Sequence, residues 1–270
     1  MSALTALVIE VEALYPGTLD SATGQAVQGL WLNHWKRLHP ELSQPLHDQY
    51  PVKPYTVSPL MGLPLPVRGR VAIQRGDRAW FRVVSLDSLL SEKLVEEWLP
   101  LLPSPIKIAG LEWKIIQTWY DNHTHAWAGQ ADFNVLSSAP DSCQERQEWH
   151  LEFITPTTFK VGKHNLPFPL PNLLINSWLR RWNRLGVEPI AEELLSQARD
   201  GLAVSAYSLK TVPARNNDRL IIGCVGELTL KPIGLDAQTR RIIEALCKFA
   251  FWAGTGQHTT QGFGMTRLKE

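Results

Sequence analysis

The sequence has 270 residues, of which 44% are hydrophobic and 20% charged, a balance typical of a globular protein with one or two domains. Its formal net charge of +1 argues against the strongly basic class of nucleic-acid-binding proteins, so any such site must come from local clusters of charge. No apolar run has membrane-spanning length and the first residues alternate like a strand, so we expect no membrane partner, no signal peptide and a cytoplasmic location.

The first half of the chain predicts the element order β-α-β-β-α-β. Residues 4–12 alternate like a half-buried strand, and apolar residues within 24–38 recur with the helical period. Residues 67–74 and 78–86 flank the turn Arg75-Gly76-Asp77-Arg78 and predict a hairpin. Asp87 is expected to cap a second helix that ends near Leu99, and residues 106–120 predict a further strand or pair of strands.

The same order recurs after a polar stretch at 137–148, which is typical of a linker between domains. Residues 149–156 predict a strand and 170–186 a helix that ends at Gly186. Residues 201–213 and 218–232 predict a hairpin across Ala-Arg-Asn-Asn, and Asp236 is expected to cap a helix that precedes a last strand within 262–268. The sequence therefore predicts an α+β protein of two tandem ferredoxin-like (RRM-like) βαββαβ domains, residues 1–140 and 148–270.

The three cysteines are Cys143, Cys224 and Cys247. They lack the paired spacing of zinc ligands, and their odd number argues against a disulfide framework. Cys224 and Cys247 fall in apolar runs and are expected in the core. His39 and His47 with Asp48 do not match a recognised ligand spacing either, so we expect no metal and no cofactor.

The stretch GTGQHTTQGFG near the end of the chain is unusually rich in glycine and polar residues. It holds two Gly-x-Gly pairs, Gly254/Gly256 and Gly262/Gly264, around five polar residues that include His258. Glycines without Cβ atoms let main chain approach a ligand, and their N–H groups can donate to phosphate oxygens. The alternative is that the glycines only satisfy the geometry of the turn.

Three stretches in this order resemble the CRISPR-associated endoribonucleases that cut precursor CRISPR RNA within its repeats. The glycine loop is similar to the C-terminal signature of that family. Residues 29–62 resemble its first helix, a short second helix with a Leu-His pair, and a Lys-Pro-aromatic-Thr-x-Ser strand. Residues 153–183 resemble the opening of its second domain, with Pro-Thr-x-Phe and then Arg-Trp-Asn.

The resemblance implies two ferredoxin-like domains and metal-independent cleavage of RNA by the ribose 2′-OH, which leaves a 2′,3′-cyclic phosphate and a 5′-OH. His47 matches the family's catalytic histidine, and Lys53 matches a lysine of its active site. His34 lies on the first helix, where some members carry a functional histidine, although its apolar position equally fits a core histidine. Leu32 stands where one pattern has a catalytic tyrosine, which leaves the second proton carrier unidentified.

For RNA binding we expect the four loop glycines, His258 and several basic groups to contribute. The basic candidates are Arg68, Arg70, Lys163, His164, Arg180 and Arg181, each of which also fits an ordinary solvated position. The implied partner is CRISPR repeat RNA, as a stem-loop or a wrapped single strand, together with other CRISPR-associated proteins of an effector complex.

Three other functions compete with repeat cleavage. The first is a non-catalytic subunit that binds repeat RNA. The second is an unrelated RRM-like RNA binder, but the Lys/Arg-Gly-aromatic-Gly strand signature is absent from the sequence. The third is an α+β enzyme acting on small molecules, but the sequence has no GxxxxGK[ST] nucleotide loop.

Overall fold

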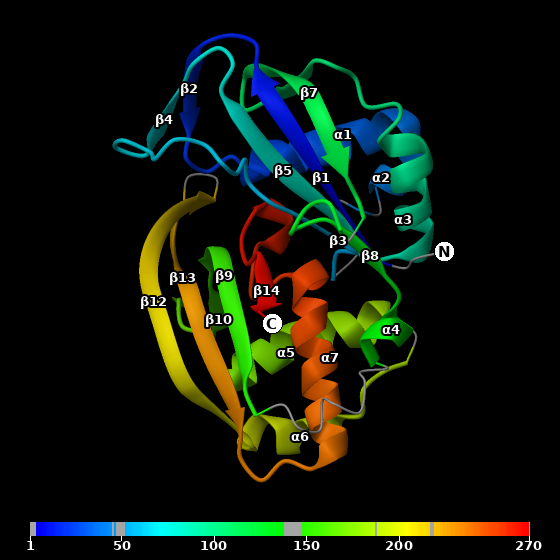
Figure 1. Cartoon of the computed structure of the whole chain (residues 1–270), viewed down its shortest axis with the longest axis vertical. Coiled ribbons are helices and arrows are strands. Elements are labelled where there is room, and N and C mark those ends of the chain that lie inside the picture. Colours follow the sequence, from blue (N-terminus) through cyan, green and yellow to red (C-terminus); the bar gives the residue numbers. More distant parts are fainter. Residues whose placement is uncertain are drawn as a thin grey trace. The chain divides into compact units, whose positions relative to one another are not determined.

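The computed structural model of the chain describes residues 4–44, 46, 52–121, 123–137, 147–186, 188–216 and 219–269 (Figure 1). It divides into two compact units. Unit 1 comprises Met1–Ala131, Arg215–Arg219 and Thr260–Gly262, and unit 2 comprises Asp132–Ala214, Leu220–Thr259 and Phe263–Glu270. No helix among the described residues is long and apolar enough to cross a membrane.

Unit 1 is built on an antiparallel sheet with the order β3-β5-β1-β7-β6, to which β8 adds beside β1. Its elements are β1 (Leu4–Ala13), α1 (Gly24–Leu38), α2 (Pro40–Gln44), β3 (Tyr55–Val57), β5 (Arg78–Ser85), α3 (Ser88–Lys93), η2 (Leu94–Trp98), β6 (Ile106–Ile108), β7 (Leu111–Trp119) and β8 (Gly129–Ala131). Counting β1, β3, β5 and β7 as first to fourth, the spatial order is 2-3-1-4, the order of a ferredoxin-like sheet.

The sequence periods explain why unit 1 folds this way. Alternate residues of β1, among them Ile9, belong to the core that α1 covers with Val27, Trp31 and Trp35. The opposite face of β1 is also buried, as at Val8, so the strand is more buried than its alternation predicts. The predicted helix at 24–38 is confirmed. The predicted cap is also confirmed, since the Asp87 carboxylate accepts a bond of 2.9 Å from the backbone N–H of Leu90 at the start of α3.

The hairpin predicted across Arg75–Arg78 is wrong. Residues 70–73 do form a strand, β4 (Arg70–Ile73), but it pairs with β2 (Gly17–Asp20) rather than with β5, which lies between β1 and β3. Leu19 and Val71 are partners in the β2–β4 register and both are buried. The turn itself closes the end of β1, since the Ala13 N–H donates to the Asp77 carbonyl at 2.9 Å. Alternation predicts a strand but not its partner, and burial of the Leu19–Val71 pair decides the pairing.

Unit 2 repeats the strand order of unit 1. Its main elements are β9 (Trp149–Thr157), α5 (Pro171–Leu185), β12 (Leu202–Asn216), β13 (Arg219–Pro232), α7 (Ala237–Ala253) and β14 (Thr266–Lys269). The sheet order β12-β13-β9-β14 is again 2-3-1-4, and β12 and β13 form the predicted hairpin. The fold class of two ferredoxin-like βαββαβ halves is confirmed.

Four shorter elements belong to unit 2. They are α4 (Phe133–Ser137), β10 (Phe159–Val161), β11 (His164–Leu166) and α6 (Glu192–Asp200). A short 3-10 helix, η4 (Thr259–Gln261), begins in unit 2 and ends in the unit 1 segment Thr260–Gly262. The predicted cap of α7 is confirmed, because the Asp236 carboxylate accepts a bond of 2.7 Å from the Thr239 N–H. Cys224 and Cys247 are buried as expected, and burial raises the pKa of Cys224 to about 11. Cys143 and most of the predicted linker lie outside the described residues.

Candidate functional site

The segment that carries His47 follows α2 in unit 1, and His47 itself lies outside the described residues. The chain on either side is anchored, because Leu46 and Val52 are both buried. Lys53 is half-buried and comes directly before Pro54, whose carbonyl accepts a bond of 2.8 Å from the Leu86 N–H. The backbone at Lys53 is thereby fixed at the start of β3.

His34 is a core residue in this structure. Its side chain is buried, its Nε2 donates to the Trp98 carbonyl at 2.9 Å, and its ring packs edge-on against the Trp98 indole at 5.1 Å. Burial lowers the pKa of His34, which favours the neutral ring. These contacts fit the interpretation of His34 as a core histidine rather than as a catalytic group that contacts RNA.

Neither Leu32 on α1 nor Tyr55 on β3 is suited to be the second proton carrier. Leu32 has no titratable group, and Tyr55 is 2% exposed, with its hydroxyl accepting a bond of 3.1 Å from Gln28 Nε2. Burial raises the pKa of the Tyr55 hydroxyl. Tyr55 therefore acts as a packing residue beneath α1.

His39, considered from the sequence only as a metal ligand, connects three elements of unit 1. Its Nδ1 lies 3.0 Å from a Glu41 carboxylate oxygen on α2, and its Nε2 lies 2.5 Å from one of Glu97 on η2. Hydrogen bonds from Lys93 and His39 lower the pKa of Glu97. His39 thus fixes the end of α1 beside the short helix that leads to the His47 segment.

The four loop glycines are required by the protein's own packing. All have positive φ, from 65° at Gly254 to 90° at Gly262. A Cβ at Gly256 would lie 2.3 Å from the Thr158 carbonyl oxygen, and one at Gly264 would lie 2.0 Å from that of Thr255. Real Cβ atoms do not approach backbone this closely, so the alternative of structural glycines accounts for both positions.

The expectation that the loop glycines offer N–H groups to phosphate is wrong for three of the four. The N–H of Gly254 donates to Ala250 O, that of Gly256 to Ser177 Oγ, and that of Gly264 to Pro156 O, at 2.8–3.0 Å. Each donor is already satisfied within unit 2. The glycine pattern does indicate a place where another group comes close to the main chain. That group is backbone of the same protein rather than RNA.

Arg181 is part of the support of this loop. Its guanidinium donates to the carbonyls of Ala253 and Gly254 and, at 2.6 Å, to the Thr259 hydroxyl. Burial lowers the pKa of Arg181 to about 10. The neighbouring Arg180 is exposed at the surface of α5. The two adjacent arginines, predicted together as RNA contacts, therefore have different surroundings.

The remaining predicted contacts lie at the surface, except for His258. Arg68 and Arg70 are exposed at the turn into β4, and Lys163 and His164 are exposed at the turn between β10 and β11. His258 is half-buried, with its ring 5.6 Å from that of Phe263. The RNA-binding role of all these residues stays a prediction.

Sequence reasoning passed over the cations of the long β12–β13 hairpin. Lys210, Arg215 and Arg219 are exposed along it. The sequence does contain the basic residues that would indicate RNA binding, but they are spread over two long strands. Each cation taken alone has the pattern of an ordinary solvated strand face.

Two family models match the chain in succession. The model described as CRISPR Cas6 N-terminal domain matches residues 4–138, and the model described as CRISPR-associated endoribonuclease Cas6 matches residues 151–266. Among curated relatives, CRISPR-associated endoribonuclease Cas6 of Streptococcus thermophilus is 30% identical over 121 residues, and that of Mycobacterium tuberculosis is 26% identical over 127 residues. These matches cover 44% and 46% of this chain, and the chain spans 49% and 40% of the relatives' own length.

The likeness to solved structures extends over nearly the whole chain and is a likeness of fold. A Cas6 (TTHB231) product complex superposes with a TM-score of 0.82 at 24% identity, covering 98% of this chain and 100% of that one. Thermus thermophilus Cas6 (TTHB231) superposes with a TM-score of 0.76 at 24% identity, covering 100% and 99%.

Proposed function

Since the chain belongs to the Cas6 family of CRISPR-associated endoribonucleases, we propose that it binds precursor CRISPR RNA and cuts it within its repeats. The observation that carries this proposal is the match of two family models in order, one over residues 4–138 and one over 151–266. RNA is the proposed partner, with other CRISPR-associated proteins as further partners of the product complex.

The proposed reaction uses a hydroxyl of the substrate as nucleophile. The ribose 2′-OH loses its proton to a base and attacks the adjacent phosphorus. The bond from phosphorus to the 5′-oxygen then breaks, and that oxygen takes a proton from an acid. The products are a 2′,3′-cyclic phosphate and a 5′-OH. Charge accumulates on the phosphate oxygens in between, so a cation beside them lowers the barrier.

We assign one proton transfer to His47 and the phosphate charge to Lys53. An unperturbed imidazole has a pKa near ~6.5 and can give or accept a proton at neutral pH. Lys53 supports this assignment by its position, because its backbone is fixed at the start of β3 and its side chain is half-buried. A lysine ammonium placed beside the phosphate would stabilise the transition state without a metal ion.

We assign RNA binding to the exposed cations and to the shape of the glycine loop. Arg68, Arg70, Lys163 and Arg180 are exposed and supply charge for the phosphates. His164 and His258 add polar edges. The glycine loop contributes a fixed backbone shape, since most of its glycine donors are used within the protein.

Single-turnover cleavage of repeat RNA tests the proposal. Wild-type protein should cut in excess EDTA, because the proposed reaction assigns the phosphate charge to Lys53 and one proton transfer to His47 rather than to a metal ion. A substrate with 2′-deoxyribose before the cut should resist. His47→Ala should lower the rate by about 10²–10⁴ with little change in affinity. His123→Ala, at an exposed histidine to which no role is assigned, is the matched control and should cut at the wild-type rate. Cleavage of the deoxy substrate would overturn the 2′-OH mechanism.

A second candidate function is a subunit that binds repeat RNA without cutting it. It is favoured by the burial of His34 and by Leu32 at the position of a catalytic tyrosine. The same assay separates the two functions. Tight binding of repeat RNA with no cleavage by the wild-type protein would favour the subunit and reject the nuclease.

A further inference from the structure

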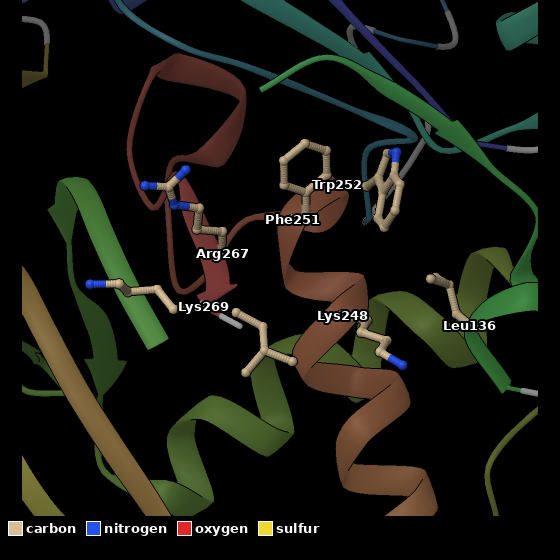
Figure 2. A pocket seen from close by; sticks show the side chains of 7 residues that line it. Leu136, Lys248, Phe251, Trp252, Arg267 and Lys269 are labelled. Carbon is tan, nitrogen blue, oxygen red and sulfur yellow. The ribbon is translucent and has the colours of Figure 1, made fainter. Parts of the chain in front are cut away.

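Unit 2 contains a pocket of about 560 Å³ at the edge of its sheet (Figure 2). It is formed by the end of α7, by the edge strand β14 and by α4. Its lining residues are Leu136, Lys248, Phe251, Trp252, Arg267, Leu268 and Lys269. None of them was predicted from the sequence to bind RNA, and the volume is in the range of ~300–1,000 Å³ typical of ligand sites.

Four of the lining residues are apolar or aromatic. Phe251 and Trp252 are half-buried on the last turn of α7, with ring centroids 4.8 Å apart and ring planes at 75°. Leu136 of α4 and Leu268 of β14 complete this part of the lining. An aromatic surface of this kind stacks with any nucleobase, because every base presents a π-face.

The charged lining residues are all basic. Lys248 extends from α7 on one side of the pocket, and Arg267 and Lys269 extend from β14 on the other (Figure 2). Within the described part of the chain, no aspartate or glutamate lines the pocket. An apolar, aromatic surface with cations on two sides suits a short piece of RNA. One base can lie on the aromatic surface while the phosphates on either side of that nucleotide lie near the cations.

The three cations have carboxylate neighbours outside the pocket lining. Lys248 lies 3.2 Å from Glu244. Arg267 lies 2.6 Å from Glu152. Lys269 lies 2.8 Å from Glu227. The Arg267 and Lys269 pairs are partly exposed on both sides and contribute only ~0–1 kcal/mol each, whereas Glu244 is 1% exposed and its pair with Lys248 is not a surface pair. A phosphate can therefore share or replace the carboxylates beside Arg267 and Lys269 at small cost. At Lys248 it can only add a second contact, because the buried Glu244 keeps its own.

We propose that this pocket binds a single-stranded stretch of RNA, with a base against Phe251 and Trp252 and phosphates at Lys248 and at Arg267 and Lys269. The inference rests on the proposed function and adds to it a binding site within unit 2. An acidic protein segment would satisfy the cations, but its carboxylates would not use the aromatic surface of Phe251 and Trp252. The observations therefore favour RNA.

Binding of a short polyuridylate of about twelve nucleotides, followed by fluorescence anisotropy, tests the pocket separately from cleavage. The double variant Lys248→Gln/Lys269→Gln removes two of the three cations and should weaken binding at least about fivefold. Its melting temperature is measured beside binding, because Lys248→Gln also removes the cation beside the buried Glu244. Trp252→Leu should weaken it similarly, provided that its melting temperature shows a folded protein. Lys231→Gln, at an exposed lysine of β13 outside the pocket, is the matched control and should bind as wild type.

Two outcomes would overturn the inference. One is wild-type affinity for polyuridylate in the folded double variant. The other is loss of binding to hexaglutamate, with polyuridylate binding intact, which would identify the pocket as a site for an acidic protein segment. Cleavage of repeat RNA by the wild-type protein is measured beside these assays. A protein that cuts normally but fails the polyuridylate test rejects the pocket and leaves the proposed function standing.

Discussion

The glycine loop at 254–264 and the turn between β10 and β11 are two glycine-containing turns that use their backbones in opposite ways. Gly256 has φ of 78°, and its N–H donates to Ser177 Oγ. Gly162, in the β10–β11 turn, has φ of 57°, and a Cβ there would meet nothing within 4 Å. The backbone of the loop is used in contacts within the protein, whereas the turn presents its side chains to solvent. A glycine motif alone therefore does not locate the surface that binds RNA.

The largest effect should come from adding a Cβ at Gly256, and the same change at Gly162 is its matched control. Gly256→Ala should lower the free energy of unfolding by at least ~3 kcal/mol, because it combines an unfavourable φ with a Cβ placed 2.3 Å from the Thr158 carbonyl oxygen. Gly162→Ala has the same φ problem without the collision and should cost about 1 kcal/mol. Denaturant unfolding of both variants measures the difference. Equal losses would show that the loop is no more constrained than the turn.

This comparison also separates what the sequence could predict from what it could not. Residues 24–38 and Asp87 were predictable because helical period and caps are local signals. The pairing of β4 with β2 was not, because the strand pattern at 70–73 carries no information about the buried partner Leu19. The contact of Gly256 with Thr158 depends on the folded chain as well.

The same limit applies to the candidate sites. The Gly-x-Gly pairs located a special loop, but only the structure shows that Ala250, Ser177 and Pro156 occupy its N–H donors. The position of His34 on the apolar face of α1 fits both a core role and a catalytic role. Its bond to Trp98, which is distant in the sequence, is visible only in the structure. The α7–β14 pocket escaped notice because its cations are distributed over two segments.

A smaller effect should separate the adjacent arginines of α5. Arg181→Leu removes the donors to the Ala253 carbonyl and the Thr259 hydroxyl and should cost about 2–4 kcal/mol of unfolding free energy. Arg180→Leu, at an exposed position, should change stability by less than about 0.5 kcal/mol and serves as the matched control. Thermal melting of the two variants checks this. Similar melting temperatures would mean that Arg181 does not hold the loop.

The smallest effect on stability, and the direct test of the solvent-facing turn, comes from Lys163→Gln combined with His164→Gln. Both side chains are exposed, and a Cβ at the neighbouring Gly162 meets nothing, so the melting temperature should stay at the wild-type value. If the turn binds the RNA backbone, affinity for repeat RNA should fall about threefold to tenfold, which is ~0.7–1.4 kcal/mol. The slope of log affinity against log salt should also become shallower by about 0.7 for each single-strand phosphate that the variant no longer neutralises.

Lys231→Gln, at an exposed lysine on β13 of the same unit, controls for a general loss of positive charge. An unchanged salt slope together with unchanged affinity in the double variant would remove the turn from the RNA-binding surface, because a phosphate-binding cation must release counterions when RNA binds. The proposed RNA-binding residues would then be the exposed arginines of unit 1 and those of the α7–β14 pocket.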